Sequence, residues 1–273
     1  MRVAVVGHVE WIEFARVPRV PAPGEIVHAS ETWQEPGGGG AVSAVQLAKL
    51  AGGADFFCAL GDTPLGRRAR DDLEEQGLRV HAALRPVPQR RAFVHLDERS
   101  ERTITVIGER LGPRGDDPLP WELLDDADAV YFTAGDGGAA RQARRARTMV
   151  ATARGLETLV ESGVELDALV ASAKDEGERY RGELEPPPRV VVLTAGGAGG
   201  EWKARDGKGG RYRAAPLPGP SSDAYGAGDS FAGGLTFGLG EGRSLGDALA
   251  LATRCGAAAL TGRGCFAGQL TRP

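Results

Sequence analysis

Short apolar runs alternate with segments of helical periodicity along most of this chain. Val3–Val6 is a continuous apolar run that ends at Gly7, as in a strand covered on both faces. After the glycines at 37–40, the apolar residues of Ala41–Leu50 recur at helical spacing and predict a helix. Further strands are predicted at Phe56–Leu60, near Val80, and at Ala129–Phe132, Thr148–Ala151, Ala168–Ala171 and Arg189–Leu193. This alternation predicts an α/β fold, with a central, mostly parallel sheet and helices on both faces.

Two segments interrupt the alternation and predict a small β lid apart from the main sheet. The first, residues 9–36, contains several prolines and then alternates over Glu25–Trp33, which predicts one or two exposed strands. The second, residues 90–110, contains Arg91–Leu96 and Arg102–Ile107 on either side of a polar turn, which predicts a hairpin. We therefore expect a single domain over residues 1–273, with its lid drawn from these two segments.

A glycine-rich turn precedes the first of the C-terminal helices. Gly226, Ala227 and Gly228 carry almost no side chain, and Asp229 follows them directly. The first N–H groups of a helix lack internal partners and lie at the positive end of its dipole, so bare backbone there can bind a phosphate. A helix N-terminus also lowers the pKa of a nearby carboxylate, so we expect Asp229 to be a weak base.

Composition narrows the class of partner. The chain of 273 residues is 41% hydrophobic and 26% charged, which suits a globular protein with a full core. Its net charge of −4 and pI of 5.7 argue against nucleic acid or an anionic membrane as the main partner, so a small molecule is expected. No apolar run could span a bilayer, and the first run is too short for a signal peptide, so we expect a cytoplasmic location. Cys58, Cys255 and Cys265 lack metal-ligand spacing and are expected to be reduced, buried thiols.

Three familiar motifs are absent from the sequence. There is no Gly-x-x-x-x-Gly-Lys-Ser/Thr loop, and the turn after the first strand, Gly7-His8-Val9-Glu10, lacks Gly-x-Gly-x-x-Gly. No Gly-x-Ser-x-Gly elbow follows a strand, which disfavours a Ser-His-Asp hydrolase. The glycine turn at 226–228 is therefore the main candidate for chemistry.

Two glycine signatures, far apart and in order, resemble those of the ribokinase-like, PfkB-type carbohydrate kinases. Asp223–Asp229, followed by Gly233-Gly234, resembles the C-terminal signature, with Ala224 where Thr, Ser, Pro or Val is usual. Gly38–Gly40 resembles the N-terminal signature. The resemblance covers nearly the whole chain and implies a ribokinase-like three-layer sandwich with a β lid. It also implies an ATP- and Mg²⁺-dependent kinase that phosphorylates a hydroxyl of a small sugar or sugar-like substrate.

The resemblance assigns roles to individual residues. Asp229 would be the catalytic base, and the backbone N–H groups of Gly226, Ala227 and Gly228 would bind the charge on the moving γ-phosphoryl group. These residue types fit, because phosphoryl transfer needs positioning and charge stabilisation more than covalent help. The nucleotide side would comprise Thr194, Gly196, Gly199, Gly256 and Ala257.

The substrate side departs most from the family pattern. Gly38 and Gly39 match the signature, but Val42 stands where Asn is usual, which removes a donor and an acceptor. Glu10 and Glu13 are the acids nearest to the usual position of an Asp that binds substrate hydroxyls. Both are equally consistent with solvated acids on a lid strand.

The metal side departs from the pattern as well. The Asn-x-x-Glu stretch that relatives use for magnesium and phosphate appears only as Ser172-Ala173-Lys174-Asp175, or is shifted to Glu176, which leaves Asp175 as the candidate. Asp223 either orients the anion loop or contributes to a site for a monovalent cation such as K⁺.

Three functions remain open. A sugar kinase comes first, and a nucleoside kinase would be favoured by an apolar surface at Val42. A non-catalytic binder of sugar or nucleotide is favoured by the altered motifs and disfavoured by the intact turn before Asp229. Exposed lid edges predict a homodimer.

Overall fold

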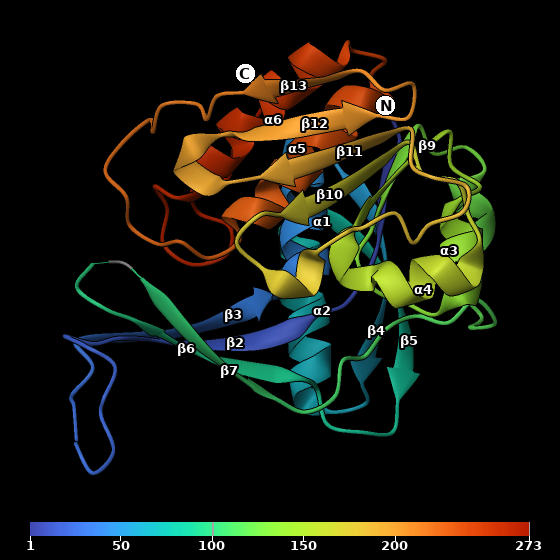
Figure 1. Cartoon of the computed structure of the whole chain (residues 1–273). Coiled ribbons are helices and arrows are strands. Elements are labelled where there is room, and N and C mark those ends of the chain that lie inside the picture. Colours follow the sequence, from blue (N-terminus) through green and yellow to red (C-terminus); the bar gives the residue numbers. More distant parts are fainter. Residues whose placement is uncertain (100, 273) are drawn as a thin grey trace.

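The computed structural model describes residues 1–99 and 101–272, and a sheet of nine strands runs through it (Figure 1). The strand order is β13-β12-β11-β10-β9-β8-β1-β4-β5. The bounds are β1 (Val3–Val6), β4 (Ala54–Gly61), β5 (Leu78–Arg85), β8 (Ala129–Phe132), β9 (Thr148–Thr152), β10 (Ala168–Ser172), β11 (Val190–Thr194), β12 (Gly200–Ala204) and β13 (Gly209–Tyr212). Neighbours from β11 to β5 are parallel, and only β11-β12-β13 pair antiparallel. The mostly parallel sheet predicted from the apolar runs is confirmed.

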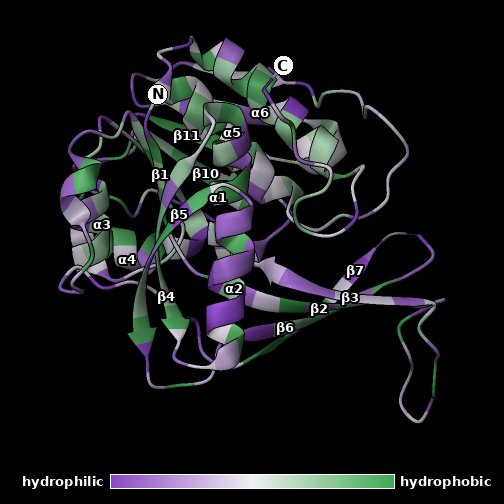
Figure 2. Ribbon diagram, turned by 180° about the vertical axis from the view of Figure 1, so that it is seen from behind, coloured by the Kyte–Doolittle hydropathy of each residue, from purple (hydrophilic) through white to green (hydrophobic). Residues whose placement is uncertain are grey.

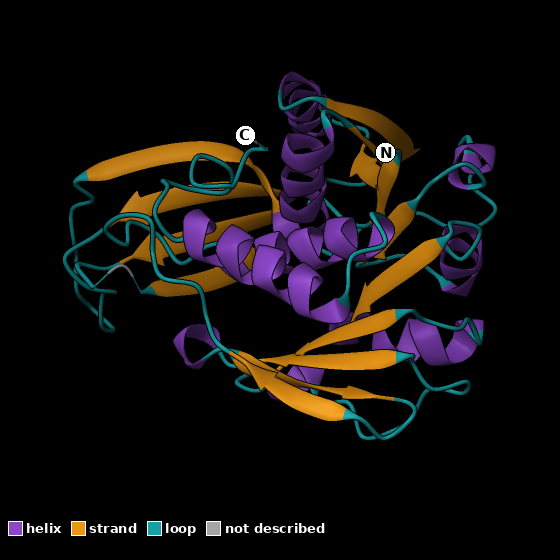
Figure 3. Ribbon diagram, turned by 90° about the horizontal axis from the view of Figure 1, so that it is seen from above, coloured by secondary structure: helices purple, strands orange, loops and turns teal. Residues whose placement is uncertain are grey.

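Helices cover both faces of this sheet, as predicted (Figures 1 and 3). Val3 and Val5 lie in a larger core with α1, α5 and α6, whereas Ala4 and Val6 lie in a second core with α3 and α4. A strand buried on both faces must be apolar at every position, which explains the continuous run. The helices are α1 (Gly38–Ala51), α2 (Pro64–Glu75), α3 (Gly137–Ala143), α4 (Leu156–Ser162), α5 (Ala227–Gly240) and α6 (Leu245–Ala259), with short 3-10 helices at Trp121–Leu124, Ala153–Gly155, Glu176–Glu178 and Gly196–Ala198.

A second sheet, the lid sheet, has the strand order β3-β2-β6-β7. Its strands are β2 (Glu10–Arg16), β3 (Glu31–Gly37), β6 (Arg91–Leu96) and β7 (Arg102–Ile107). The hairpin predicted at β6 and β7 is confirmed. Figure 2 shows this sheet projecting from the main body below α5 and α6.

The strand predicted over Glu25–Trp33 is wrong in its position. Pairing with β2 begins at Glu31, opposite Arg16, and continues to Gly37 opposite Glu10. Residues 25–29 have no strand partner and are mostly exposed, with Ile26 at 86%. Alternation alone cannot fix the register, which here is set by the partner strand.

The chain enters the lid sheet directly from the carboxyl edge of the main sheet. Residues 7–9 connect β1 to β2, and residues 86–90 connect β5 to β6. These connections place the lid sheet beside the strand ends where α/β proteins usually bind ligands. Cys58, Cys255 and Cys265 are buried and unbridged, as expected. In the described part of the chain, no helix has the length and apolarity needed to cross a membrane.

Candidate active site

The glycine turn forms a bare helix N-terminus. Gly226 has a φ of 73° and precedes α5, and a Cβ built on it would lie 2.8 Å from Cγ1 of Val42. A Cβ on Gly228 would meet nothing within 4 Å. The first N–H groups of α5 thus face open space, which suits a bound anion.

Asp229 lies where the N-termini of α5 and α1 converge. A Cβ on Gly39 would come within 2.9 Å of its Oδ1, and the hydroxyl of Ser43 donates to its carbonyl oxygen at 3.1 Å. The two glycine signatures, far apart in sequence, therefore meet at one carboxylate.

A cavity of about 370 Å³, which we call the Asp229 cavity, opens above this point. It is formed by residues at the carboxyl ends of the parallel strands together with the first residue of lid strand β7. It is lined by His8, Gly39, Arg102, Arg110, Tyr131, Thr133, Thr152, Arg154, Val170, Ser172, Lys174, Asp175, Glu178, Thr194, Gly228 and Asp229.

Sequence reasoning missed several of these residues. His8, Thr133 and Arg154 each follow an apolar strand by one or two positions, at the ends of β1, β8 and β9. The available signal was the polar side chain within two residues of each strand end, since parallel strands present these at one edge.

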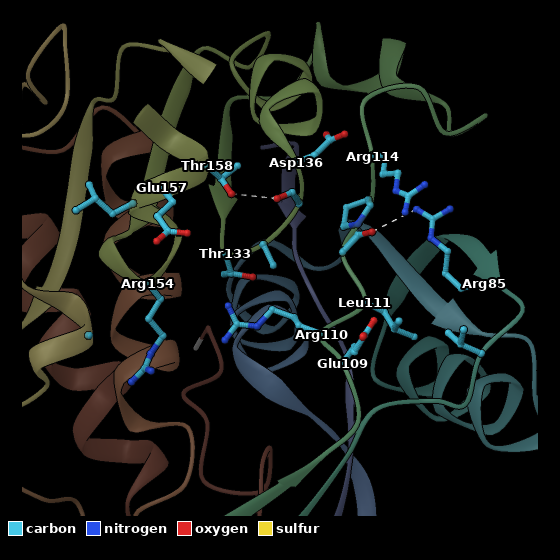
Figure 4. Close-up of a pocket in the computed structure, with 18 of the residues that line it drawn as sticks. Arg85, Glu109, Arg110, Leu111, Arg114, Thr133, Asp136, Arg154, Glu157 and Thr158 are labelled. Atoms are coloured by element: carbon cyan, nitrogen blue, oxygen red, sulfur yellow. Dashed lines mark hydrogen bonds between the residues drawn. The ribbon is translucent and has the colours of Figure 1, made fainter. Parts of the chain in front are cut away.

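A wider hollow of about 950 Å³, the outer groove, adjoins the Asp229 cavity. It is bounded by residues 109–114, 133–136 and 153–158, and it shares Arg110, Thr133 and Arg154 with the cavity. Figure 4 shows Arg110 and Arg154 extending toward the same space, beneath Thr133.

Burial raises the pKa of Asp229, while Arg102 and Arg154 lower it by smaller amounts. The net direction is therefore opposite to the lowering expected from the helix N-terminus, because the loss of water around this half-buried carboxylate outweighs the favourable charges. Asp229 is a stronger base than the sequence indicated.

His8 is neutral at physiological pH, because burial lowers its pKa to about 3, with Arg110, Arg90 and Arg154 adding to the effect. Its Nε2 lies 3.8 Å from Glu10, but among the described residues its Nδ1 has no hydrogen-bond partner. The buried hydroxyl of Thr133 also lacks one. Buried polar atoms are normally satisfied. The Thr133 hydroxyl is packed against Gly7, where a Cβ would lie 2.3 Å from it, so it does not open onto the cavity.

Arg102 connects the lid sheet to the glycine turn. Its guanidinium donates to the carbonyl of Ala224 at 2.7 Å and lies over the ring of Tyr225, 5.7 Å from the centroid. The Tyr225 hydroxyl in turn accepts from the backbone N–H of Gly38 at 3.1 Å. Lid strand, turn and α1 are thus joined around the cavity.

The two proposed metal ligands already have partners. Arg154 pairs with Asp175 through Nη2 and with Glu178 through Nε at 2.7 Å, and the backbone N–H of Gly177 donates to Asp175. Asp223 is fully buried and accepts from the backbone of Tyr225 at 2.7 Å and of Gly264 at 3.0 Å. Across residues 1–99 and 101–272, no cluster of three or more acidic, His or Cys side chains could hold a metal. These residues do not fit a dedicated metal site.

The predicted substrate residues divide into two groups. Gly38, with φ of 85°, packs against His8 and Glu10, and Glu10 pairs with Arg90 at 2.6 Å beside the cavity. Glu13 lies three positions after Glu10 on the same strand, so it points to the opposite face, where it pairs with Arg91 at 2.6 Å. Glu13 does not line the Asp229 cavity.

Val42 does not line the cavity either. It is fully buried beneath Gly226, and its carbonyl accepts from the side chain of Gln269 at 2.8 Å. It therefore supports the turn from below, and its apolar side chain says little about the acceptor.

The residues predicted to bind the nucleotide also fall into two groups. Thr194 lines the cavity, and a Cβ on Gly196 would lie 3.4 Å from Nζ of Lys174, which lines it too. The other three residues have packing roles. A Cβ on Gly199 would lie 2.1 Å from the carbonyl oxygen of Tyr212, and a Cβ on Gly256 would lie 3.2 Å from the carbonyl oxygen of Ala227. Ala257 is buried.

Comparison with known proteins agrees with this geometry. A model of the pfkB family of carbohydrate kinases matches residues 1–154 and 142–272. An ATP-dependent ribose-1-phosphate kinase from Halopiger xanaduensis is 28% identical over 278 residues, covering 94% of this chain and 91% of the relative.

Solved ribokinase structures share the fold. That of Thermotoga maritima has a TM-score of 0.80 at 20% identity and covers 100% of this chain and 97% of its own. That of Arabidopsis thaliana, complexed with ribose and ATP, has a TM-score of 0.78 at 19% identity and covers 98% and 95%. Because the family model spans both signatures and nearly every residue, the chain belongs to the pfkB family of carbohydrate kinases and has the ribokinase-like α/β fold.

Proposed function

We propose that this chain transfers the γ-phosphoryl group of ATP to a hydroxyl of a sugar, with Asp229 as the base. The observation that carries the proposal is the placement of the Asp229 carboxylate beside a bare helix N-terminus, in a cavity at the carboxyl edge of the parallel sheet. Its raised pKa suits a group that must accept a proton.

In the proposed step, the acceptor hydroxyl oxygen forms a bond to the γ-phosphorus as the bond from that phosphorus to the β–γ bridging oxygen breaks. The hydroxyl proton passes to Asp229, and ADP leaves with the bridging oxygen. Backbone N–H groups of Gly226, Ala227 and Gly228 stabilise the charge that develops on the transferred group. Lys174 and Thr194 also line the cavity and suit the nucleotide phosphates.

Magnesium, if used, would enter bound to the nucleotide phosphates, because Asp175 is already engaged by Arg154. Asp223 orients the glycine turn through its hydrogen bond to Tyr225. A homodimer formed through the lid sheet remains a prediction, which rests on the fully exposed edge strand β7.

The relatives leave the acceptor open between a free sugar and a sugar phosphate. One is described as a ribose-1-phosphate kinase and another as a ribokinase complexed with ribose. A panel of free sugars, sugar phosphates and nucleosides, assayed for ADP release, would separate these acceptors and the nucleoside alternative.

Asp229→Asn tests the proposed base. We expect kcat to fall by about a thousandfold while ATP binding persists, because the substitution removes the proton acceptor but little volume. Asp247→Asn is the matched control, since Asp247 occupies the first turn of α6 just as Asp229 does in α5. Near-wild-type turnover by the Asp229 variant would refute the assignment. Ligand binding by the wild type without turnover of any acceptor would favour a non-catalytic binder.

A further inference from the structure

Helices α1 and α5 pack closely along a seam below Asp229, which we call the α1–α5 seam. A Cβ on Gly233 would lie 3.2 Å from the carbonyl oxygen of Ser43 and 3.2 Å from Cβ of Gln46, so no side chain fits between the helices there. Where side chains do not interlock, little prevents one helix from sliding along the other. The contact between Gly39 and Asp229 nevertheless requires one register of the two helices. Directional hydrogen bonds across the seam can supply it.

Gln269 makes two such hydrogen bonds from outside both helices. Its side-chain amide donates to the carbonyl oxygen of Val42 in α1 at 2.8 Å and to the hydroxyl of Ser230 in α5 at 3.2 Å. The carbonyl can only accept, so it fixes the orientation of the amide. Ser230 directly follows Asp229, and the side chain of Val42 lies beneath Gly226. One amide therefore joins the residue next to the base to the residue that supports the anion-binding turn.

These hydrogen bonds lie in the interior of the protein. Gln269 is 5% exposed, and Val42 and Ser230 are fully buried. Breaking a buried hydrogen bond leaves a polar group without water, so its geometry is strongly maintained. Ser43 is also fully buried, and its hydroxyl adds a third hydrogen bond across the seam, to the carbonyl oxygen of Asp229 at 3.1 Å. Gln269 and Ser43 thus hold the first turn of α5 against α1.

The backbone around Gln269 is anchored independently of its side chain. On one side of it in the sequence, the carboxylate of Glu35 accepts from the backbone N–H of Cys265 at 2.9 Å. On the other side, the amide of Gln46 donates to the carbonyl oxygen of Leu270 at 2.8 Å. Removal of the Gln269 amide should therefore leave the segment in place, so the effect of a substitution can be assigned to the two lost hydrogen bonds.

We propose that Gln269 is a positioning residue for catalysis, which together with Ser43 fixes the register of α5 against α1 and so holds the Asp229 carboxylate in place. Gln269 lines neither the Asp229 cavity nor the outer groove, so it acts through Asp229 and not on a substrate. A displacement of about 1 Å at a reacting group can lower a rate about a hundredfold. This inference rests on the proposed kinase function with Asp229 as the base.

Gln269→Met tests the inference, because it removes the amide and retains the length of the side chain. With the acceptor of the panel that turns over fastest, we expect kcat to fall about 10- to 100-fold. The KM for ATP should keep its wild-type value, since no contact to the nucleotide is lost.

Thr236→Val is the matched control. Thr236 is fully buried in α5, and its hydroxyl donates to the carbonyl oxygen of Ala232 in the same helix at 2.8 Å. The substitution removes a buried hydrogen bond from α5 without affecting the seam. It should lower the melting temperature and leave kcat unchanged.

Ser43→Ala gives a second, smaller change at the seam, which keeps the test available if Gln269→Met does not fold. It should also lower kcat. If both side chains fix the same register, the loss of kcat in the double variant should be smaller than the product of the two single losses, because the register is already free after the first substitution.

A measurement that does not depend on turnover separates this inference from the proposed function. Burial raises the pKa of Asp229, and a carboxylate that is held less firmly should meet more water. An NMR titration of the Asp229 carboxyl carbon should therefore give a lower midpoint in Gln269→Met than in the wild type. Thr236→Val should leave the midpoint unchanged.

Four results would count against the inference or its premise. Wild-type kcat in Gln269→Met, or an equal loss of kcat in Thr236→Val, would reduce Gln269 to a purely structural role. Losses that multiply fully in the Gln269 and Ser43 double variant would exclude a shared register. Absence of turnover by the wild type with every acceptor would refute the kinase function, and an unshifted titration of Asp229 in Gln269→Met would refute the positioning role in either case.

Discussion

Gly39 and Asp229 are in contact across the convergence of α1 and α5, so closely that a Cβ on Gly39 would lie 2.9 Å from the carboxylate oxygen Oδ1. Through this contact, the backbone at Gly39 in the N-terminal signature supports the carboxylate of Asp229 in the C-terminal signature. No residue with a side chain fits at position 39 without moving this oxygen.

Gly39→Ala should therefore lower kcat by about a hundredfold, because a displacement of about 1 Å at a reacting group can cost that much. Steady-state kinetics and a melting curve would measure the effect on turnover and on folding. Gly246→Ala, where the nearest atom to the new Cβ would be Ser244 Oγ at 3.9 Å, is the control. Equal kcat values for both variants would show that the contact is not needed.

Removal of the Asp229 charge should stabilise the protein while it abolishes turnover. A raised pKa means that the folded state binds the proton of Asp229 more tightly than the unfolded state does, so protonation stabilises the fold. This stabilisation is lost as pH rises through the raised pKa. At neutral pH the ionised carboxylate thus destabilises the fold, and Asp229→Asn should have the higher free energy of unfolding in urea. The difference should shrink on acidification, and a less stable variant at neutral pH would contradict the pKa direction.

The pH profile of kcat/KM should report the titration of Asp229. Since burial raises the pKa of Asp229, activity should decline on acidification at a pH above the usual range of an aspartate. Arg102 lowers that pKa, so Arg102→Gln should move the acid limb to higher pH. Arg91→Gln, which changes a lid arginine of β6 that pairs with Glu13, should not move it.

His8 should make the fold sensitive to acid. Its pKa is lowered from 6.5 to about 3, so its contribution to stability is fully present above pH 6.5 and is lost as pH falls toward 3. Urea unfolding of the wild type and of His8→Asn should be measured across this pH range. The difference between their free energies of unfolding gives the contribution of His8. A difference that does not change with pH would mean that His8 is not buried in its neutral form.

Val42→Asn should not restore a polar acceptor pocket. The residue is fully buried against Gly226, so an Asn amide there would lack water and should destabilise the protein by about 1–3 kcal/mol. Chemical denaturation and kinetics with the acceptor panel would measure both effects. A lower KM for a free sugar without loss of stability would show that position 42 faces the acceptor after all.

The sequence predicted the parts of this molecule that depend on local pattern. Val3–Val6 and Ala129–Phe132 match strands β1 and β8 because strands covered on both faces are continuously apolar. The glycine turn at 226–228 was apparent because helix N-termini that bind anions exclude side chains.

What the sequence could not predict depends on the three-dimensional arrangement of distant segments. Gly7 and Thr133 become neighbours only through the pairing of β1 with β8 in the main sheet. The same holds for the pKa of Asp229, since its burial is set by segments more than a hundred residues away. Val42 was judged by its place in a motif, whereas its orientation follows from the packing of α1 against the turn.

The contact between Arg102 and Ala224 connects solvent exclusion to proton affinity. Arg102 lies on lid strand β7 and lowers the pKa of Asp229, so any opening that separates it from Ala224 would withdraw a positive charge from the base. With the lid open, Asp229 would also regain contact with water, and because burial has the larger influence on its pKa, that pKa would fall toward the ordinary value of an aspartate. Closure of the lid would then raise the proton affinity of Asp229 at the same time as it excludes water, so the base would be strongest only when ATP is protected from hydrolysis.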